Sequence, residues 1–84
     1  MSDLAQRFAE AQARIKPVTN LGNDVMLELY ALYKQATAGD GTGERPGMLD
    51  LRGRAKFDAW VRRKGMTRTA AMEAYIALVG QHAP

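Results

Sequence analysis

The chain has 84 residues, of which 46% are hydrophobic and 25% charged, with a formal net charge of +3. This length suits one domain, residues 1–84, with a modest core. The absence of cysteine excludes disulfides, thiolate zinc sites and cysteine nucleophiles. No apolar run approaches the roughly 20 residues that cross a bilayer, and charged residues near the start argue against a signal peptide. We therefore expect a cytoplasmic protein without stable membrane insertion.

Proline, glycine and capping residues divide the chain into four predicted helices, with little sign of strands. The first helix is predicted over residues 3–15, with Ser2 as its N-cap and an alanine-rich sequence behind it. Pro17 ends it, because the residue before a proline is disfavoured in the helical region. Residues 17–23 then form a turn.

The second predicted helix covers residues 24–38. Asn23 can cap its start, and Gly39 can take the left-handed conformation at its end. The segment 39–49 contains four glycines and one proline, which excludes a regular element there. We expect a loop that is long enough to cross the bundle.

The third predicted helix begins at Asp50 as N-cap and stops at Gly65. Thr67 caps the fourth, which continues to about residues 80–81. The predicted fold class is therefore all-α, a small four-helix bundle. The helix pattern leaves open which helices are neighbours.

Two stripes of side chains run along the second predicted helix, roughly 110° apart. One is apolar and comprises Val25, Leu29, Leu32 and Ala36. The other combines aromatic, apolar and polar side chains: Met26, Tyr30, Tyr33, Lys34 and Thr37. Two rings beside an ammonium group suit a nucleotide-like ligand, because they can stack a flat ring and hold a phosphate. The alternative is that the tyrosines are core residues with their hydroxyls at the rim, beside an ordinary snorkelling lysine.

A basic stripe is predicted on the third helix, where Arg52, Lys56 and Arg63 share a face with Ala59. The apolar stripe lies elsewhere and comprises Phe57, Trp60, Val61 and the stem of Lys64. Cations separate from the core face would suit several phosphate groups. Between residues 52 and 68 seven basic residues oppose one acid, a local charge of +6. This indicates either an anionic partner or a solvated basic face.

No catalytic set is apparent. The one serine, Ser2, and the one histidine, His82, lie near opposite ends of the chain, which argues against a Ser–His pair and a transition-metal site. The glycine-containing loop lacks the Gly-Lys-Ser/Thr ending of a P-loop, and no strand precedes it. We predict that the protein is not an enzyme.

The central part of the chain resembles the acyl-CoA-binding protein family. The resemblance lies in Leu-Tyr-Ala-Leu-Tyr-Lys-Gln-Ala-Thr at 29–37, Gly-Asp at 39–40 and Arg-Pro-Gly-Met-Leu-Asp at 45–50. It continues through Gly53, Ala55-Lys56, Asp58-Ala59-Trp60, Lys64-Gly65-Met66 and residues 71–76. It spans about residues 26–79 and extends more weakly to Phe8 and Ala11.

The resemblance implies a four-helix bundle that binds medium- to long-chain fatty acyl-CoA non-covalently, as an intracellular carrier and pool former. It also implies a monomer without cofactor or metal. The ligand-binding positions that it implies are Lys16, Tyr30, Ala31, Leu32, Tyr33, Lys34, Arg52, Lys56 and Tyr75. Tyr30, Tyr33 and Lys34 would contact the nucleotide end. Arg14 is the substitute for Lys16, because the connection to Met26 is about one residue short.

Two departures from the family pattern affect the third helix. Phe57 stands where the family usually has tryptophan, which keeps a ring but loses the indole donor. Arg52 and Arg54 replace common lysines, which preserves charge and changes its geometry.

Two other functions compete with acyl-CoA binding. A small basic helical domain could bind nucleic acid through the +6 segment, although this would leave the aromatic stripe of the second helix unexplained. A structural or protein-interaction bundle could cover that stripe with a partner. We expect acyl-CoA binding and no nucleic-acid partner.

Overall fold

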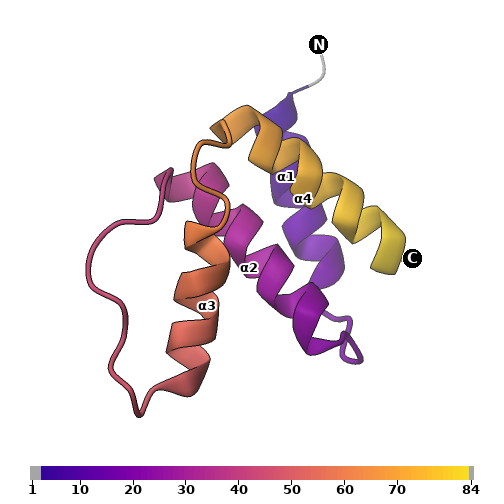
Figure 1. Ribbon diagram of the computed structural model, residues 1–84. Coiled ribbons are helices and arrows are strands. Elements are labelled where there is room, and N and C mark those ends of the chain that lie inside the picture. The colour runs from indigo at the N-terminus through magenta and orange to yellow at the C-terminus, as the bar shows by residue number, and fades with distance from the viewer. Residues whose placement is uncertain (1–2, 84) are drawn as a thin grey trace.

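The computed structural model describes residues 3–83 and shows four helices packed as a bundle (Figure 1). They are α1 (Leu4–Ile15), α2 (Asn23–Ala38), α3 (Leu51–Val61) and α4 (Arg68–His82), and the described residues contain no strand. The predicted all-α, four-helix class is confirmed. Helix α2 packs against α3 on one side and α4 on the other, and α1 packs against α4. Helix α3 therefore lies at the outside of the bundle, where α2 is its helical neighbour.

The core lies between α1, α2 and α4. Its buried members are Phe8, Ala11, Leu29, Leu32, Ala36, Ala71, Tyr75, Val79 and Ala83. Three residues of the first stripe of α2 belong to this cluster, and Val25 packs against it half-buried. The apolar stripe is thus confirmed as the core face of α2. Of the second stripe, Met26, Tyr30 and Lys34 lie toward α3, whereas Tyr33 stacks on Phe8 of α1.

The observed starts of α1 and α2 differ from the predicted ones by about one residue. Ser2 lies outside the described residues, and the N-cap of α1 is Asp3, whose carboxylate accepts from two backbone N–H groups of the first turn. Helix α2 begins at Asn23, so the predicted cap is wrong, and Gly22 holds the cap position without a side-chain hydrogen bond. Asp24 then places a negative charge in the first turn, where the helix dipole favours it.

The ends of α3 and α4 also differ from the prediction, whereas their starts agree. Asp50 accepts from the N–H of Gly53 at 2.9 Å and Thr67 caps α4. Helix α3 ends at Val61 instead of Gly65, because the chain tightens into turns with i to i+3 hydrogen bonds over residues 60–66. Helix α4 continues to His82, slightly beyond the predicted end.

The long loop does not cross the bundle but runs beside α3 (Figure 1). The guanidinium of Arg45 forms a two-pronged ion pair with Asp58, with N–O distances of 3.0 and 2.7 Å. Arg54 Nε donates to the carbonyl of Pro46 at 2.9 Å. These contacts use one face of α3 to hold the loop, and so leave another face for α2.

A polar joint fixes the C-terminal end of α2. Gly39 has φ 83° and ψ −153°, a positive φ outside the left-handed helical region that was predicted, and its carbonyl accepts from Trp60 Nε1 at 2.8 Å. Gln35 Nε2 and the N–H of Gly65 both donate to Asp40 Oδ1, at 2.7 and 2.9 Å. The Gly65 and Gln35 hydrogen bonds lower the pKa of Asp40, because they stabilise its carboxylate form. The joint thereby fixes α3 and α4 relative to α2.

Candidate functional site

A cleft of about 590 Å³ lies between the N-terminal half of α2 and the start of α3. It brings together three of the predicted ligand residues, Tyr30 from α2 and Arg52 and Lys56 from α3. The Lys56 ammonium lies 5.3 Å from the centre of the Tyr30 ring. The other lining residues are Asn23, Met26, Leu27, Leu51 and Ala55. One opening thus offers an aromatic ring, two cations and apolar side chains.

The orientation of α3 corrects the predicted division of its faces. Ala59, predicted to lie on a basic face away from the core, is the buried residue of α3 and shares a cleft wall with Leu27 of α2. Trp60, predicted for the core face, instead packs near Gly41 of the long loop. A small side chain at the contact lets α3 approach α2 closely. The cations therefore flank the contact between α2 and α3 and are not separate from the packed face.

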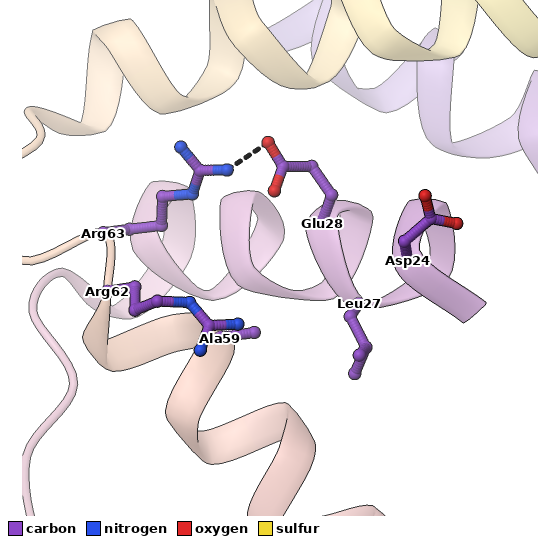
Figure 2. Close-up of a pocket in the computed structure, with 6 residues that line it drawn as sticks. All are labelled: Asp24, Leu27, Glu28, Ala59, Arg62 and Arg63. Atoms are coloured by element: carbon purple, nitrogen blue, oxygen red, sulfur yellow. Dashed lines mark ion pairs between the residues drawn. The ribbon is translucent and has the colours of Figure 1, made fainter. Parts of the chain in front are cut away.

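Arg63 does not join Arg52 and Lys56, although all three were predicted for one stripe. It pairs with Glu28 of α2 in a different cleft, of about 470 Å³, which Asp24 and Arg62 also line (Figure 2). Figure 2 shows the guanidinium of Arg63 turned toward the carboxylate of Glu28. Since both charge signs line this cleft, it is less suited to a phosphate group than the cleft at Lys56.

A third cleft, of about 500 Å³, gathers Lys16, Tyr33 and Tyr75. The ring of Phe8 connects the two tyrosines: it stacks on Tyr33 with a centroid distance of 6.1 Å and meets Tyr75 edge-on at 5.0 Å. Burial raises the pKa of Tyr75, and the nearby Tyr33 adds to this effect. Lys16, and not its substitute Arg14, lines this cleft. The remaining lining residues are Ala9, Gln12, Ala13 and Ile15.

The other predicted ligand residues lie on α2 itself. Lys34 is half-buried, one helical turn after Tyr30, and its ammonium lies 4.9 Å from the centre of the Trp60 ring. Ala31 and Leu32 are 1% and 2% exposed, so their side chains pack inside the protein. A ligand role for these three residues, as for the other predicted positions, stays a prediction.

Several lining residues were not predicted from the sequence. In the cleft between α2 and α3 these are Asn23, Leu27, Leu51 and Ala55. Leu51 and Ala55 precede Arg52 and Lys56 by one position each, so the same four-residue spacing places an apolar pair beside the basic pair. That spacing was a usable signal. The position of Gln12 and Ile15 beside α4 depends on long-range packing, and the sequence pattern contains no signal for such packing.

Comparison with known proteins agrees with the sequence resemblance. The family model described as "Acyl CoA binding protein" matches residues 5–79. The chain belongs to the acyl-CoA-binding protein family. An acyl-CoA-binding protein homolog 1 from Caenorhabditis elegans is 49% identical over 73 residues, which cover 86% of this chain and 85% of that protein. An acyl-CoA-binding protein from Saccharomyces cerevisiae is 43% identical over 79 residues, which cover 93% and 91%.

Solved structures of acyl-CoA-binding proteins share the fold. The crystal structure of Oryza sativa acyl-CoA-binding protein 2 matches with a TM-score of 0.91 at 40% identity, covering 94% of this chain and 87% of that one. The solution structure of an acyl coenzyme A binding protein from yeast matches with a TM-score of 0.72 at 46% identity, covering 92% of this chain and 91% of that one. The four-helix arrangement is therefore that of the acyl-CoA-binding protein family.

Two further features of residues 3–83 concern metal binding and membrane spanning. Their histidine and carboxylate side chains form no group of three or more that could hold a metal ion. Within the same residues, none of the helices combines the length and apolar character needed to cross a membrane.

Proposed function

We propose that the protein binds medium- to long-chain fatty acyl-CoA thioesters non-covalently and carries them without chemical conversion. It acts as a single-domain monomer that holds one ligand. The observation that carries this proposal is the cleft between α2 and α3. There Tyr30, Arg52 and Lys56 share one opening with apolar side chains of both helices. Family membership supports the same ligand class. The cytoplasm is the proposed compartment, and no cofactor or metal takes part.

We assign each of the three parts of acyl-CoA to side chains of the described residues. The ligand combines an adenine ring, several phosphate charges and a long hydrocarbon tail. We assign the aromatic rings of Tyr30 and Tyr33 to the nucleotide end and the cations Lys34, Arg52 and Lys56 to the phosphates. Apolar side chains of the cleft between α2 and α3 receive the start of the tail, and these include Met26, Leu27 and Leu51.

We assign Lys16 and Tyr75 to the same ligand because they share a cleft with Tyr33. All three line the cleft beside α1, and Tyr33 lies three residues after Tyr30, hence about one turn along α2. A ligand lying across α2 could therefore contact both clefts. In this arrangement Lys16 adds a cation at the nucleotide end, and the hydroxyl groups of Tyr33 and Tyr75 supply hydrogen bonds.

The tail is expected to contribute the larger share of the binding free energy. Burial of a methylene is worth roughly 0.8 kcal/mol, so a 16-carbon tail could contribute on the order of 10 kcal/mol. Each charged contact to a phosphate adds about 1.5–3 kcal/mol. Lost freedom of motion subtracts several kcal/mol from both. The tail therefore sets affinity, and the cations select the coenzyme A head group.

Isothermal titration calorimetry with free coenzyme A and its acetyl, octanoyl and palmitoyl thioesters tests the proposal. We expect affinity to rise with chain length, with free coenzyme A far weaker than the palmitoyl form. Palmitate without a head group is the matched control for the cations and should bind more weakly than palmitoyl-CoA. An affinity that is flat from acetyl to palmitoyl would exclude a tail site.

The nucleic-acid alternative gains no support from the structure. Part of the +6 segment is already engaged, since the charge of Arg63 is paired with the carboxylate of Glu28. The segment therefore presents less free positive charge than its composition indicates. Binding to duplex DNA with a steep salt dependence, together with no response to palmitoyl-CoA, would reverse this conclusion.

A further inference from the structure

An exposed apolar tip lies where the long loop joins α3. Met48, Leu49 and Leu51 are 77%, 100% and 74% exposed. Figure 1 shows this segment as a projecting tip, at the end of α3 far from the connection to α4. A contiguous patch of exposed large apolar side chains is characteristic of an interaction surface. Leu51 also lines the cleft between α2 and α3, so the tip borders the mouth of that cleft.

The tip is a defined turn. The N–H of Asp50 donates to the carbonyl of Gly47 at 3.0 Å, which places Met48 and Leu49 at the two central positions. These positions usually carry glycine, proline or small polar residues. The Asp50 carboxylate faces inward along the chain, accepting from the N–H of Gly53. The turn therefore presents two apolar side chains outward while its charged residue is engaged in the helix cap.

The loop that carries the tip is tied to α3. Arg45 and Asp58 form the two-pronged ion pair, and Arg54 Nε holds the carbonyl of Pro46. An apolar tip that is already ordered loses less conformational freedom when it is buried than a flexible one would. The two ties thus prepare Met48 and Leu49 for contact with a partner.

The charge beside the tip identifies the partner. Between residues 46 and 57 three basic residues oppose one acid, Asp50. Arg54 is tied to the loop, and the two exposed cations, Arg52 and Lys56, are left for an anionic surface. Apolar side chains next to cations are the combination that binds the interface of an anionic membrane. A second copy of the chain fits less well, because a symmetric contact through this tip would bring the same basic residues of both copies together.

We propose that the Met48–Leu51 tip docks reversibly on anionic lipid surfaces, with its apolar side chains at the headgroup level and the neighbouring cations on the lipid phosphates. Docking places the mouth of the cleft between α2 and α3 against the membrane. An acyl tail could then pass between bilayer and cleft with little exposure to water. This transfer rests on the proposed acyl-CoA function, whereas docking itself does not.

Sedimentation of the full chain with phosphatidylcholine vesicles, with and without phosphatidylserine, tests docking. We expect binding to the anionic vesicles that weakens with added salt. The Met48→Ser/Leu49→Ser double variant should bind them about tenfold or more weakly, because two exposed apolar side chains are lost. Circular dichroism should show unchanged helix content, since both side chains are exposed. In the absence of vesicles, the double variant should retain its affinity for palmitoyl-CoA within about twofold.

A second pair of variants reports insertion directly. Tryptophan emission of Leu49→Trp should shift to the blue on anionic vesicles and be quenched by brominated lipid. Thr42→Trp, at the other end of the same loop, is the matched control and should show neither change.

Three results would overturn the docking proposal. The first is a wild-type chain that binds palmitoyl-CoA in solution yet stays in the supernatant with anionic vesicles. The second is a wild-type chain that is a dimer at the concentration of the assay while the double variant is a monomer, since a second copy would then cover the tip. The third is a double variant that loses palmitoyl-CoA affinity in solution, which would make the turn a wall of the ligand site. A failure of the wild type to bind any acyl-CoA would instead refute the proposed function.

Discussion

Substitution of Lys56 by alanine is the most direct test of how the head group is held. Its ammonium lies over the ring of Tyr30 at the opening of the cleft between α2 and α3, with Arg52 on the same wall. A hydrogen bond to a charged group is worth about 1.5–3 kcal/mol. Because Lys56 is solvent-exposed, we take the lower figure, which corresponds to about a tenfold loss of affinity. The variant should stay folded, since an exposed cation–π contact contributes only about 0.5–1 kcal/mol.

The assay is calorimetric titration of Lys56→Ala with free coenzyme A and with its octanoyl and palmitoyl thioesters. A cation that contacts phosphate acts on a part that all three ligands share, so the factor of loss should be the same for each. Arg63→Ala is the matched control: it removes a positive charge at the end of α3, but this charge is paired with Glu28 in another cleft. We expect a change of less than about threefold for this control.

Two results would refute this reasoning. A loss at Lys56 that grew with chain length would place the residue against the tail. A loss at Arg63 equal to that at Lys56 would show that the overall charge of α3, and not the position of one cation, attracts the ligand.

Three further predictions concern stability. Asp40→Asn keeps the acceptor oxygen but removes the charge. Because the folded-state pKa of Asp40 is lowered from 3.8, the wild type should exceed the variant in free energy of unfolding by a constant amount above pH 3.8, and this difference should diminish as the pH falls further. Urea unfolding at several pH values measures it. Trp60→Phe removes the donor to Gly39 and should cost about 1 kcal/mol, seen as a melting temperature lower by about 4–8 °C. Tyr75→Ala removes a buried ring that packs on Phe8 and should cost about 3–5 kcal/mol in urea unfolding, whereas a cost below about 1 kcal/mol would mean that the ring is not part of the core.

The periodicity of α2 was sufficient to predict its core face. Leu29, Leu32 and Ala36 recur at helical spacing, and all three are buried. The helix starts at Asp50 and Thr67 were also predicted correctly, because a cap depends on local hydrogen bonds that the sequence specifies directly. Local chemistry and helical period therefore predicted the all-α fold, the ends of α1 and α2, and the starts of α3 and α4.

The faces of α3 could not be predicted in the same way. Phe57 and Trp60 are its large apolar residues, so the pattern assigned them to the core, and Ala59 was left among the cations. In the structure the long loop comes back beside α3 and takes the Trp60 side, and the small Ala59 lies against α2. Which face is covered depends on a contact between segments about twenty residues apart. Helical period alone contains no information about it.

The same long-range packing decides which cations remain for a ligand. A count of charges treats the basic residues between 52 and 68 as one positively charged surface. In the structure these residues differ in the contacts that they make. Arg54 holds the loop and Arg63 pairs with Glu28, whereas Arg52 and Lys56 line a cleft beside an aromatic ring. A cation that already holds a structural partner contributes little to the free energy of phosphate binding, because the original contact must be broken first. Specificity for a phosphate-bearing head group therefore follows from the few cations that the fold leaves at the cleft, and not from the net charge of the segment.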